Sequence, residues 1–212
     1  MKIVVLISGS GSNLQAIMDA CQSGYIAGQV VGVLSNKADA YGLVRAQQAG
    51  INTAIINHKE FATRQDFDLA MQKIIDVWQP DVVVLAGFMR ILTPAFVQHF
   101  EGKLINIHPS LLPLYKGLHT HQRVLATGDK LHGCSVHFVN AELDGGAVIA
   151  QAVLTVAANE AEQSLIQRVH KLEHIIYPLV LNWLSYGRLS YQQGLPVLDG
   201  QTLSTPMKLL FD

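Results

Sequence analysis

The sequence is short of cysteine, of charge and of long apolar runs, and each shortage narrows the class of protein. Cys21 and Cys134 are the only cysteines, and two lone cysteines are most simply buried free thiols. Charged residues make up 15% of the 212 residues and hydrophobic residues 50%, which favours a well-buried globular core over disorder. No apolar run approaches the roughly 20 residues of a membrane span. Met1 leads directly into a strand-like run, without a secretory signal, so we expect a cytoplasmic protein.

The chain also lacks an excess of charge of either sign. Lysine and arginine total 15 and aspartate and glutamate total 16, so the formal net charge is -1. No global basic field exists to attract nucleic acid or an anionic membrane, and we expect neither as a partner. Any anionic ligand must be bound by local groups. We therefore expect small-molecule substrates, with the chain as a monomer or homodimer.

Short β-branched runs alternate with longer amphipathic stretches, most regularly in the first half of the chain. This rhythm predicts an α/β fold, with a doubly wound, mostly parallel, Rossmann-like sheet and helices on both faces. No repeat, low-complexity stretch or linker interrupts it, so we expect a single domain over 1–212. The predicted strands are 3–7, 30–34, 53–56, 82–85, 104–107, 134–139, 148–156 and a short tail strand at 197–198 before a loose end. The predicted helices are 13–21, 40–48, 61–78, 95–99, 119–127 and 162–186, the last with a break to be considered near Pro178.

A glycine-rich turn, residues 8–13, joins the first predicted strand to the first helix. Gly9, Gly11, Ser12 and Asn13 could bring backbone N–H groups close to a phosphate at the start of the helix. The dinucleotide fingerprint is incomplete, because Leu14 occupies the third glycine position and no acidic residue ends the second strand. The Gly-Lys-Ser/Thr of a P-loop is also missing. A phosphate monoester therefore fits better than NAD, and a plain tight turn is the alternative.

Asn106 and His108 end a predicted strand and are followed by Pro109 and Pro113. Two residues apart on a strand means the same face, so an amide and an imidazole emerge side by side. Both can donate hydrogen bonds to an oxygen that gains negative charge, and the imidazole can also move a proton. The alternative is a capped strand end with solvated polar groups.

Glycines follow an acidic residue in the segment Glu142-Leu-Asp144-Gly-Gly146. Such a sharp loop can turn a carboxylate inward, although a surface turn of this kind is common. Asp144 beside His108 would favour the protonated imidazole and orient the ring. Both segments follow sheet strands, which allows them to converge.

Other polar side chains admit a functional and a structural interpretation. His119, His121, His132 and His137 lack a recognised ligand spacing, so we expect no metal. The apolar run at 88–92 could hold a flat heterocycle or simply pack in the core. Arg64 could pair with a ligand carboxylate or be solvated. His170 and Glu173 share a helix face, where the acid could accept from ligand hydroxyls or an amine, or simply face solvent.

Together these segments resemble the folate-dependent formyltransferases, and within them the branch that acts on phosphoribosylglycinamide in purine synthesis. The resemblance covers nearly the whole chain and is highly specific. Its motifs are ISGSGSNLQAI at 7–17, VVLAGFMRIL at 83–92, NIHPSLLP at 106–113, GCSVHFV at 133–139 and LDGG at 143–146.

The resemblance implies that the amine of the acceptor attacks the formyl carbon of 10-formyltetrahydrofolate, which serves as a co-substrate, without a metal. It implies catalytic roles for Asn106, His108 and Asp144. It implies acceptor binding by Gly11, Ser12, Asn13, His170 and Glu173. It implies folate contacts from Arg64, Met89, Arg90, Ile91, Leu92, Asn106, Asn140, Ala141, Glu142, Leu143 and Asp144. Ala141 stands where relatives often carry an acid, so we expect backbone contacts alone there.

Two other functions remain open on the sequence. One is hydrolysis of formyltetrahydrofolate, although the related deformylases carry an additional N-terminal domain that we do not find. The tRNA-formylating relatives carry an additional C-terminal domain, also not found. The other is a non-enzymatic nucleotide-binding module, which would not need Asn106, His108 and Asp144 together.

Overall fold

The computed structural model describes residues 1–211 of the chain. The chain divides into two compact units, Met1–Asn106 and Ile107–Asp212, each with its own internal contacts. A single domain over 1–212 stays a prediction. Among the described residues, no helix is both long and apolar enough to cross a membrane.

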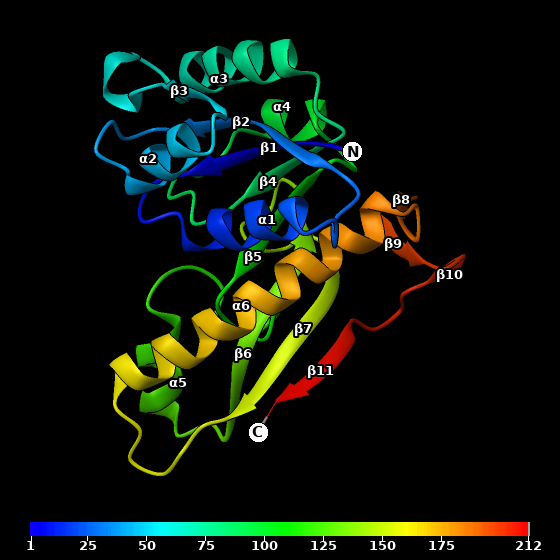
Figure 1. Ribbon diagram of the computed structural model, residues 1–212. Helices are drawn as coiled ribbons and strands as arrows, with labels where there is room; N and C mark the ends of the chain where they lie inside the picture. Colours follow the sequence, from blue (N-terminus) through cyan, green and yellow to red (C-terminus); the bar gives the residue numbers. More distant parts are fainter. Residues whose placement is uncertain (212) are drawn as a thin grey trace. The chain divides into compact units, whose positions relative to one another are not determined.

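The first unit is built on parallel strands joined by helices (Figure 1). The strands pair in the order β4-β1-β2-β3, and Leu104–Asn106 of β5 continue the parallel pairing beyond β4. The strands are β1 (Lys2–Ile7), β2 (Gln29–Ser35), β3 (Asn52–Ile55), β4 (Val82–Leu85) and β5 (Leu104–His108), and the helices are α1 (Ser12–Gln22), α2 (Tyr41–Gln48), the short 3₁₀ helix η1 (His58–Glu60), α3 (Arg64–Trp78) and α4 (Pro94–His99).

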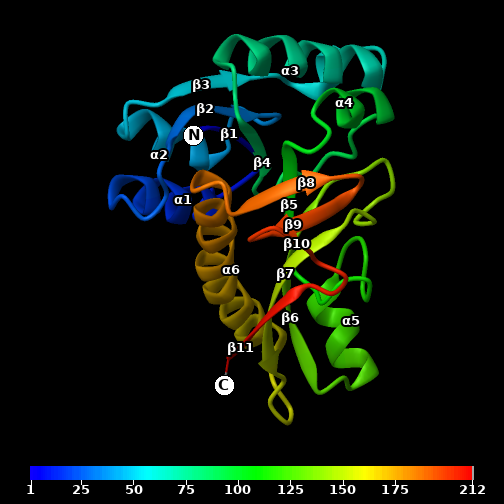
Figure 2. The same cartoon turned by 90° about the vertical axis from the view of Figure 1, so that its right-hand side faces the viewer.

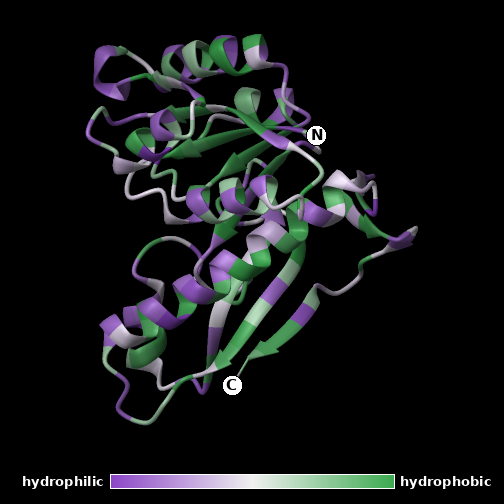
Figure 3. Ribbon diagram, in the orientation of Figure 1, coloured by the Kyte–Doolittle hydropathy of each residue, from purple (hydrophilic) through white to green (hydrophobic). Residues whose placement is uncertain are grey.

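Helices cover both faces of this parallel sheet. The crossovers through α1 and α2 run from β1 toward β3, whereas those through α3 and α4 run the opposite way. Because such crossovers are right-handed, α1 and α2 lie on one face and α3 and α4 on the other, and Figure 2 shows this division. Strands β1 and β4 are accordingly mostly apolar, as Figure 3 shows, and β4 is buried at every residue.

The second unit pairs β6 (Leu131–Phe138) antiparallel with β7 (Val148–Thr155), while β11 (Met207–Phe211) runs parallel to β7. The long helix α6 (Glu162–Ser185) packs against β6 and β7, and α5 (Thr120–Thr127) packs against α6. A separate antiparallel sheet follows α6, made of β8 (Leu189–Gln192), β9 (Leu195–Leu198) and β10 (Gln201–Thr202).

The predicted α/β class with a mostly parallel sheet is confirmed, and most predicted elements lie within one or two residues of the observed ones. The helix predicted from residue 61 begins instead at Arg64, because the Thr63 hydroxyl caps it by accepting from the Asp66 N–H. The strand predicted from residue 134 begins three residues earlier, at Leu131.

The C-terminal region differs more from expectation. Helix α6 is continuous through Pro178, which is buried together with Tyr177 and Val180, so packing of this face offsets the hydrogen bond that proline removes. The expected loose end is also wrong, because β11 pairs with five residues of β7 from Met207↔Ala150 to Phe211↔Leu154. Strands β8 and β10 were not predicted.

Candidate active site

The glycine turn before α1 is held by close packing against the start of α2. Gly11 is the residue before α1 and has φ +71°, a left-handed conformation that favours glycine. A Cβ at Gly11 would lie 2.6 Å from the Cα of Gly42, and the Gly42 N–H donates to the Gly9 carbonyl at 3.1 Å. The structure therefore presents the start of α1 on a turn that favours glycine, and a helix start is a suitable place for an anion.

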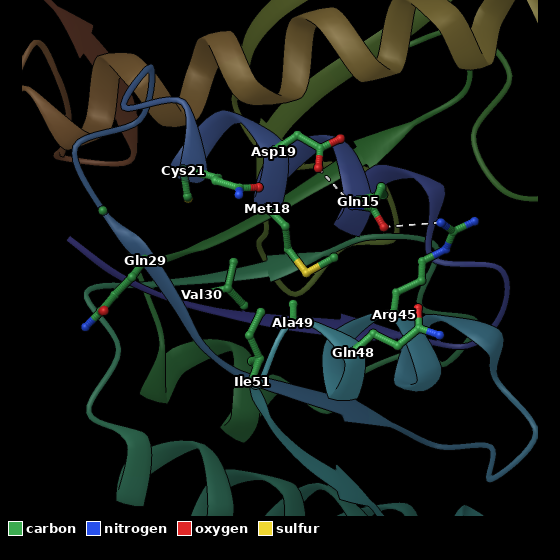
Figure 4. Close-up of a pocket in the computed structure, with 12 residues that line it drawn as sticks. Gln15, Met18, Asp19, Cys21, Gln29, Val30, Arg45, Gln48, Ala49 and Ile51 are labelled. Carbon is green, nitrogen blue, oxygen red and sulfur yellow. Dashed lines mark hydrogen bonds between the residues drawn. The ribbon is translucent and has the colours of Figure 1, made fainter.

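Arg45 of α2 fixes this turn from the side. Its Nε donates to the Ser10 carbonyl at 2.9 Å, and its Nη1 donates to Oε1 of Gln15 at 3.2 Å (Figure 4). A permanent positive charge therefore lies beside the candidate phosphate turn. Arg45 was not predicted as a site residue, because it lies far along the chain from the turn and in no recognisable motif.

A surface pocket of about 650 Å³ lies between α1 and α2, and Figure 4 shows its lining. It extends to the amino ends of β2 and β3, at Gln29 and Ile51, whereas ligands of open α/β sheets bind beyond the carboxyl ends of strands. Cys21 contributes to the lining, but burial raises the pKa of its thiol to about 11, so it is protonated and a poor nucleophile. We therefore do not identify this pocket with the candidate active site.

The segment after β4 offers apolar side chains to solvent. Met89 is 63% exposed and Ile91 is 55% exposed, so the run at 88–92 is not ordinary core packing. Asp68 of α3 is buried below this segment, and its Oδ2 accepts from the Thr93 N–H at 2.6 Å. Burial raises the pKa of Asp68, while the positive charges of Arg64 and Arg90 act in the opposite direction. The structure thus places both arginines near one carboxylate.

Asn106 and His108 both lie on β5, the first half-buried and the second buried. The His108 Nδ1 lies 3.5 Å from Oδ2 of Asp144, and these side chains are only 7% and 9% exposed. The Nε2 lies 2.9 Å from the Tyr115 carbonyl. Acceptors face both ring nitrogens, and only the imidazolium can donate to both. The structure therefore brings the predicted histidine–aspartate pair together.

The loop after β6 turns the Asp144 carboxylate inward. Asp144 has φ +47°, an unusual conformation for a residue other than glycine, and its Oδ2 also accepts from the Gly117 N–H at 2.8 Å. A Cβ at Gly146 would lie 1.8 Å from the Phe138 carbonyl. Any larger residue at this position would therefore clash with the end of β6 where the loop leads toward β7.

The rest of this loop is exposed. Oδ1 of Asn140 accepts from the Glu142 N–H at 3.0 Å, and the Glu142 carboxylate pairs with Lys116 at 2.6 Å. Leu143 is 51% exposed, and Ala141 has no polar side chain to offer. The loop therefore presents the polar side chains of Asn140 and Glu142 and the apolar side chain of Leu143 to solvent.

The two candidate residues on α6 differ in environment. His170 is exposed, whereas Glu173 is 5% exposed. Burial raises the pKa of Tyr177 and of the Cys134 thiol, and the negative charge of Glu173 raises both further. The interpretation of Glu173 as a solvent-facing acid is therefore wrong.

Two of the other histidines, His121 and His132, form a pair. His132 Nε2 lies 3.0 Å from His121 Nδ1, and burial lowers the pKa of each to about 4. Burial also lowers the pKa of His137, whose Nδ1 lies 2.8 Å from the Phe138 carbonyl. His119 precedes α5 at φ +58° instead of starting the helix. Within residues 1–211, no three His, Cys, Asp or Glu side chains are grouped to hold a metal ion.

Comparison with known proteins gives a consistent family assignment. The formyl transferase family model matches residues 1–181. Phosphoribosylglycinamide formyltransferase of Escherichia coli K12 is 57% identical over 96% of both chains, and that of Haemophilus influenzae is 50% identical over 95% of both. The solved structure of the Coxiella burnetii enzyme in complex with CHES superposes with a TM-score of 0.94, at 54% identity over 98% of both chains. The chain belongs to the formyl transferase family.

Proposed function

We propose that this chain transfers the formyl group of 10-formyltetrahydrofolate to the amine of N1-(5-phosphoribosyl)glycinamide. The products are the formyl-glycinamide ribonucleotide and tetrahydrofolate, in de novo purine synthesis. The relatives from Escherichia coli and Haemophilus influenzae are phosphoribosylglycinamide formyltransferases, which supports the acceptor and the transfer of a formyl group. The observation that carries the chemistry is the buried His108–Asp144 pair at the end of β5.

The reaction needs a group that stabilises negative charge and a group that moves protons. The acceptor amine forms a bond to the formyl carbon, and the formyl oxygen becomes an oxyanion. The bond from that carbon to N10 of the folate then breaks, the amine loses a proton and N10 gains one. Asn106 donates to the oxyanion through its amide, and the imidazolium of His108 stabilises it and assists proton transfer to N10.

Asp144 contributes to oxyanion stabilisation and proton transfer through His108. Its carboxylate holds Nδ1 in the donor form and offsets the charge of the imidazolium. The other ring nitrogen donates to the Tyr115 carbonyl, so that contact is exchanged for the reacting oxygen when substrate binds. Each such donor contributes a few kcal/mol to transition-state stabilisation, roughly 100-fold or more in rate.

The phosphate of the acceptor binds at Gly11, Ser12 and Asn13 in this proposal. The first N–H groups of α1 point outward from the turn, and the helix dipole favours an anion there. Arg45 adds positive charge through a guanidinium that is already oriented by the Ser10 carbonyl. Glu173 accepts from hydroxyl or amine groups of the acceptor, with His170 beside it on α6.

The folate binds along the exposed apolar segment after β4. Met89, Arg90, Ile91 and Leu92 cover the flat heterocycle with apolar side chains and backbone groups, and Arg64 pairs with the glutamate tail. Asn106 and the loop residues Asn140, Ala141, Glu142, Leu143 and Asp144 provide further contacts. No metal takes part in this proposal.

One assay separates this function from its rivals. Purified protein is incubated with 10-formyltetrahydrofolate, with and without phosphoribosylglycinamide, and tetrahydrofolate and formate are both measured. We expect tetrahydrofolate to form only with the acceptor present and formate to stay at background. Formate release without acceptor would establish the hydrolase instead, and no turnover in either condition would favour a binding module.

A further inference from the structure

A partly buried series of hydrogen bonds links the segments that follow β1, β2, β3 and β4 of the first unit. Ser8, directly after β1, is 5% exposed, and its Oγ donates to Oδ1 of Asn36 at 2.6 Å. The same Oγ accepts from the Met89 N–H at 2.8 Å. Asn36, directly after β2, is 2% exposed, and its Nδ2 lies 3.3 Å from Nδ1 of His58. These hydrogen bonds therefore connect Met89 through Ser8 and Asn36 to His58.

The directions of these bonds are fixed by chemistry. The Met89 N–H can only donate, so the Ser8 oxygen accepts there and uses its single proton toward Asn36. The Asn36 amide then has its nitrogen free to donate to Nδ1 of His58. Removing the Ser8 hydroxyl leaves the Met89 N–H and Oδ1 of Asn36 without this partner. The free-energy cost of leaving such groups unpaired exceeds the net contribution of the hydrogen bond itself.

The side chains of Met89 and Ile91 contribute little packing to their segment. The side chains of Met89 and Ile91 are 63% and 55% exposed, so they bury little apolar surface that could anchor the backbone. The bond from the Met89 N–H to Ser8 is a fixed point between this segment and the end of β1. Ser8 also begins the turn in which Gly42 N–H and Arg45 hold Gly9 and Ser10.

We propose that Ser8 is a positioning residue that couples the acceptor-phosphate turn to the folate-binding segment. The inference rests on the proposed function, because that function assigns residues 11–13 to one substrate and residues 89–92 to the other. Ser8 touches neither substrate. It sets the backbone at Met89 relative to the turn, so a change at Ser8 alters the binding of both substrates.

The test compares Ser8→Ala with Ser10→Ala, whose exposed hydroxyl lies on the same turn. KM for 10-formyltetrahydrofolate, KM for phosphoribosylglycinamide, kcat and the melting temperature are measured for each. In Ser8→Ala we expect both KM values to rise about tenfold, the equivalent of one hydrogen bond, with a smaller change in kcat. Ser10→Ala keeps both KM values within about twofold.

Two further variants keep the test decisive if Ser8→Ala does not fold. Ser8→Thr keeps the hydroxyl and restores both KM values toward wild type. Ser8→Cys keeps the volume but provides only a weak donor and acceptor, so it raises both KM values if Ser8→Ala does not fold. A purely structural role would lower the melting temperature and leave both KM values unchanged.

The outcomes distinguish this inference from the function on which it rests. An active wild type with unchanged KM values in the Ser8 variants, or with only one KM changed, would overturn the coupling alone. A wild type without acceptor-dependent turnover would remove the proposed function, and this inference with it.

Discussion

The Nδ1 of His108 lies 3.5 Å from Oδ2 of Asp144 in a buried contact, although His108 ends a strand and Asp144 lies on a loop after a later strand. The Tyr115 carbonyl faces the other ring nitrogen, and the Gly117 N–H holds the carboxylate. Each ring nitrogen of His108 therefore faces an oxygen acceptor. An imidazole oriented in this way can stabilise an oxyanion once substrate takes the place of the Tyr115 carbonyl.

Gly11→Ala should damage the turn itself. The added Cβ would meet the Gly42 Cα at 2.6 Å, and φ +71° is strained for alanine, so we expect a loss of about 1–3 kcal/mol in the free energy of unfolding. KM for the acceptor should rise at the same time. Gly9→Ala is the stability control, because an added Cβ there meets nothing within 4 Å. Equal unfolding curves for the two variants would contradict this packing.

Asn13→Asp should weaken acceptor binding through repulsion between its carboxylate and the phosphate. We expect KM for phosphoribosylglycinamide to rise more than in Asn13→Ala, which removes the amide without adding charge. The difference between the two variants should shrink at high salt, because part of the repulsion is screened. An acceptor KM that is unchanged in Asn13→Asp would place the phosphate elsewhere.

Stability should fall in mild acid because of His132. Its pKa is lowered from 6.5 to about 4 in the folded chain, first by burial and then by the charge of His121. Between these values the unfolded chain binds the extra proton, so this contribution is complete above pH 6.5 and is lost as the pH falls. Between pH 7 and 5, urea unfolding should show a loss of about 2 kcal/mol from this group, which His132→Gln should lack. The same pH slope in both proteins would contradict the assignment.

The sequence predicted the βαβ part of the fold because its strands are uniformly apolar and its helices carry regular apolar spacing. The tail was missed for a physical reason. Met207, Leu209 and Leu210 give little alternation, and β11 is specified by its pairing with β7 rather than by its own pattern.

The candidate site was predicted in part. Asn106, His108 and Asp144 could be proposed because the first two lie at the end of a strand and the third on the loop after another strand, where side chains meet ligands. Arg45 and Ser8 could not, since their importance lies in bonds to Ser10 and Met89, which are distant in the chain. Local spacing also could not show that Glu173 is buried, because a helix face acquires its environment from what packs against it.

The central claim is that the Asp144 carboxylate acts on the reaction through His108, whereas its folate contact is a loop contact that Asp144→Asn retains. The most direct test is kcat of Asp144→Asn together with its Kd for tetrahydrofolate. Asp199→Asn, which removes a carboxylate from an exposed pair with Arg188, is the control. We predict that kcat falls by about 100-fold or more while the Kd stays within about threefold of wild type. A wild-type kcat in Asp144→Asn would contradict the account.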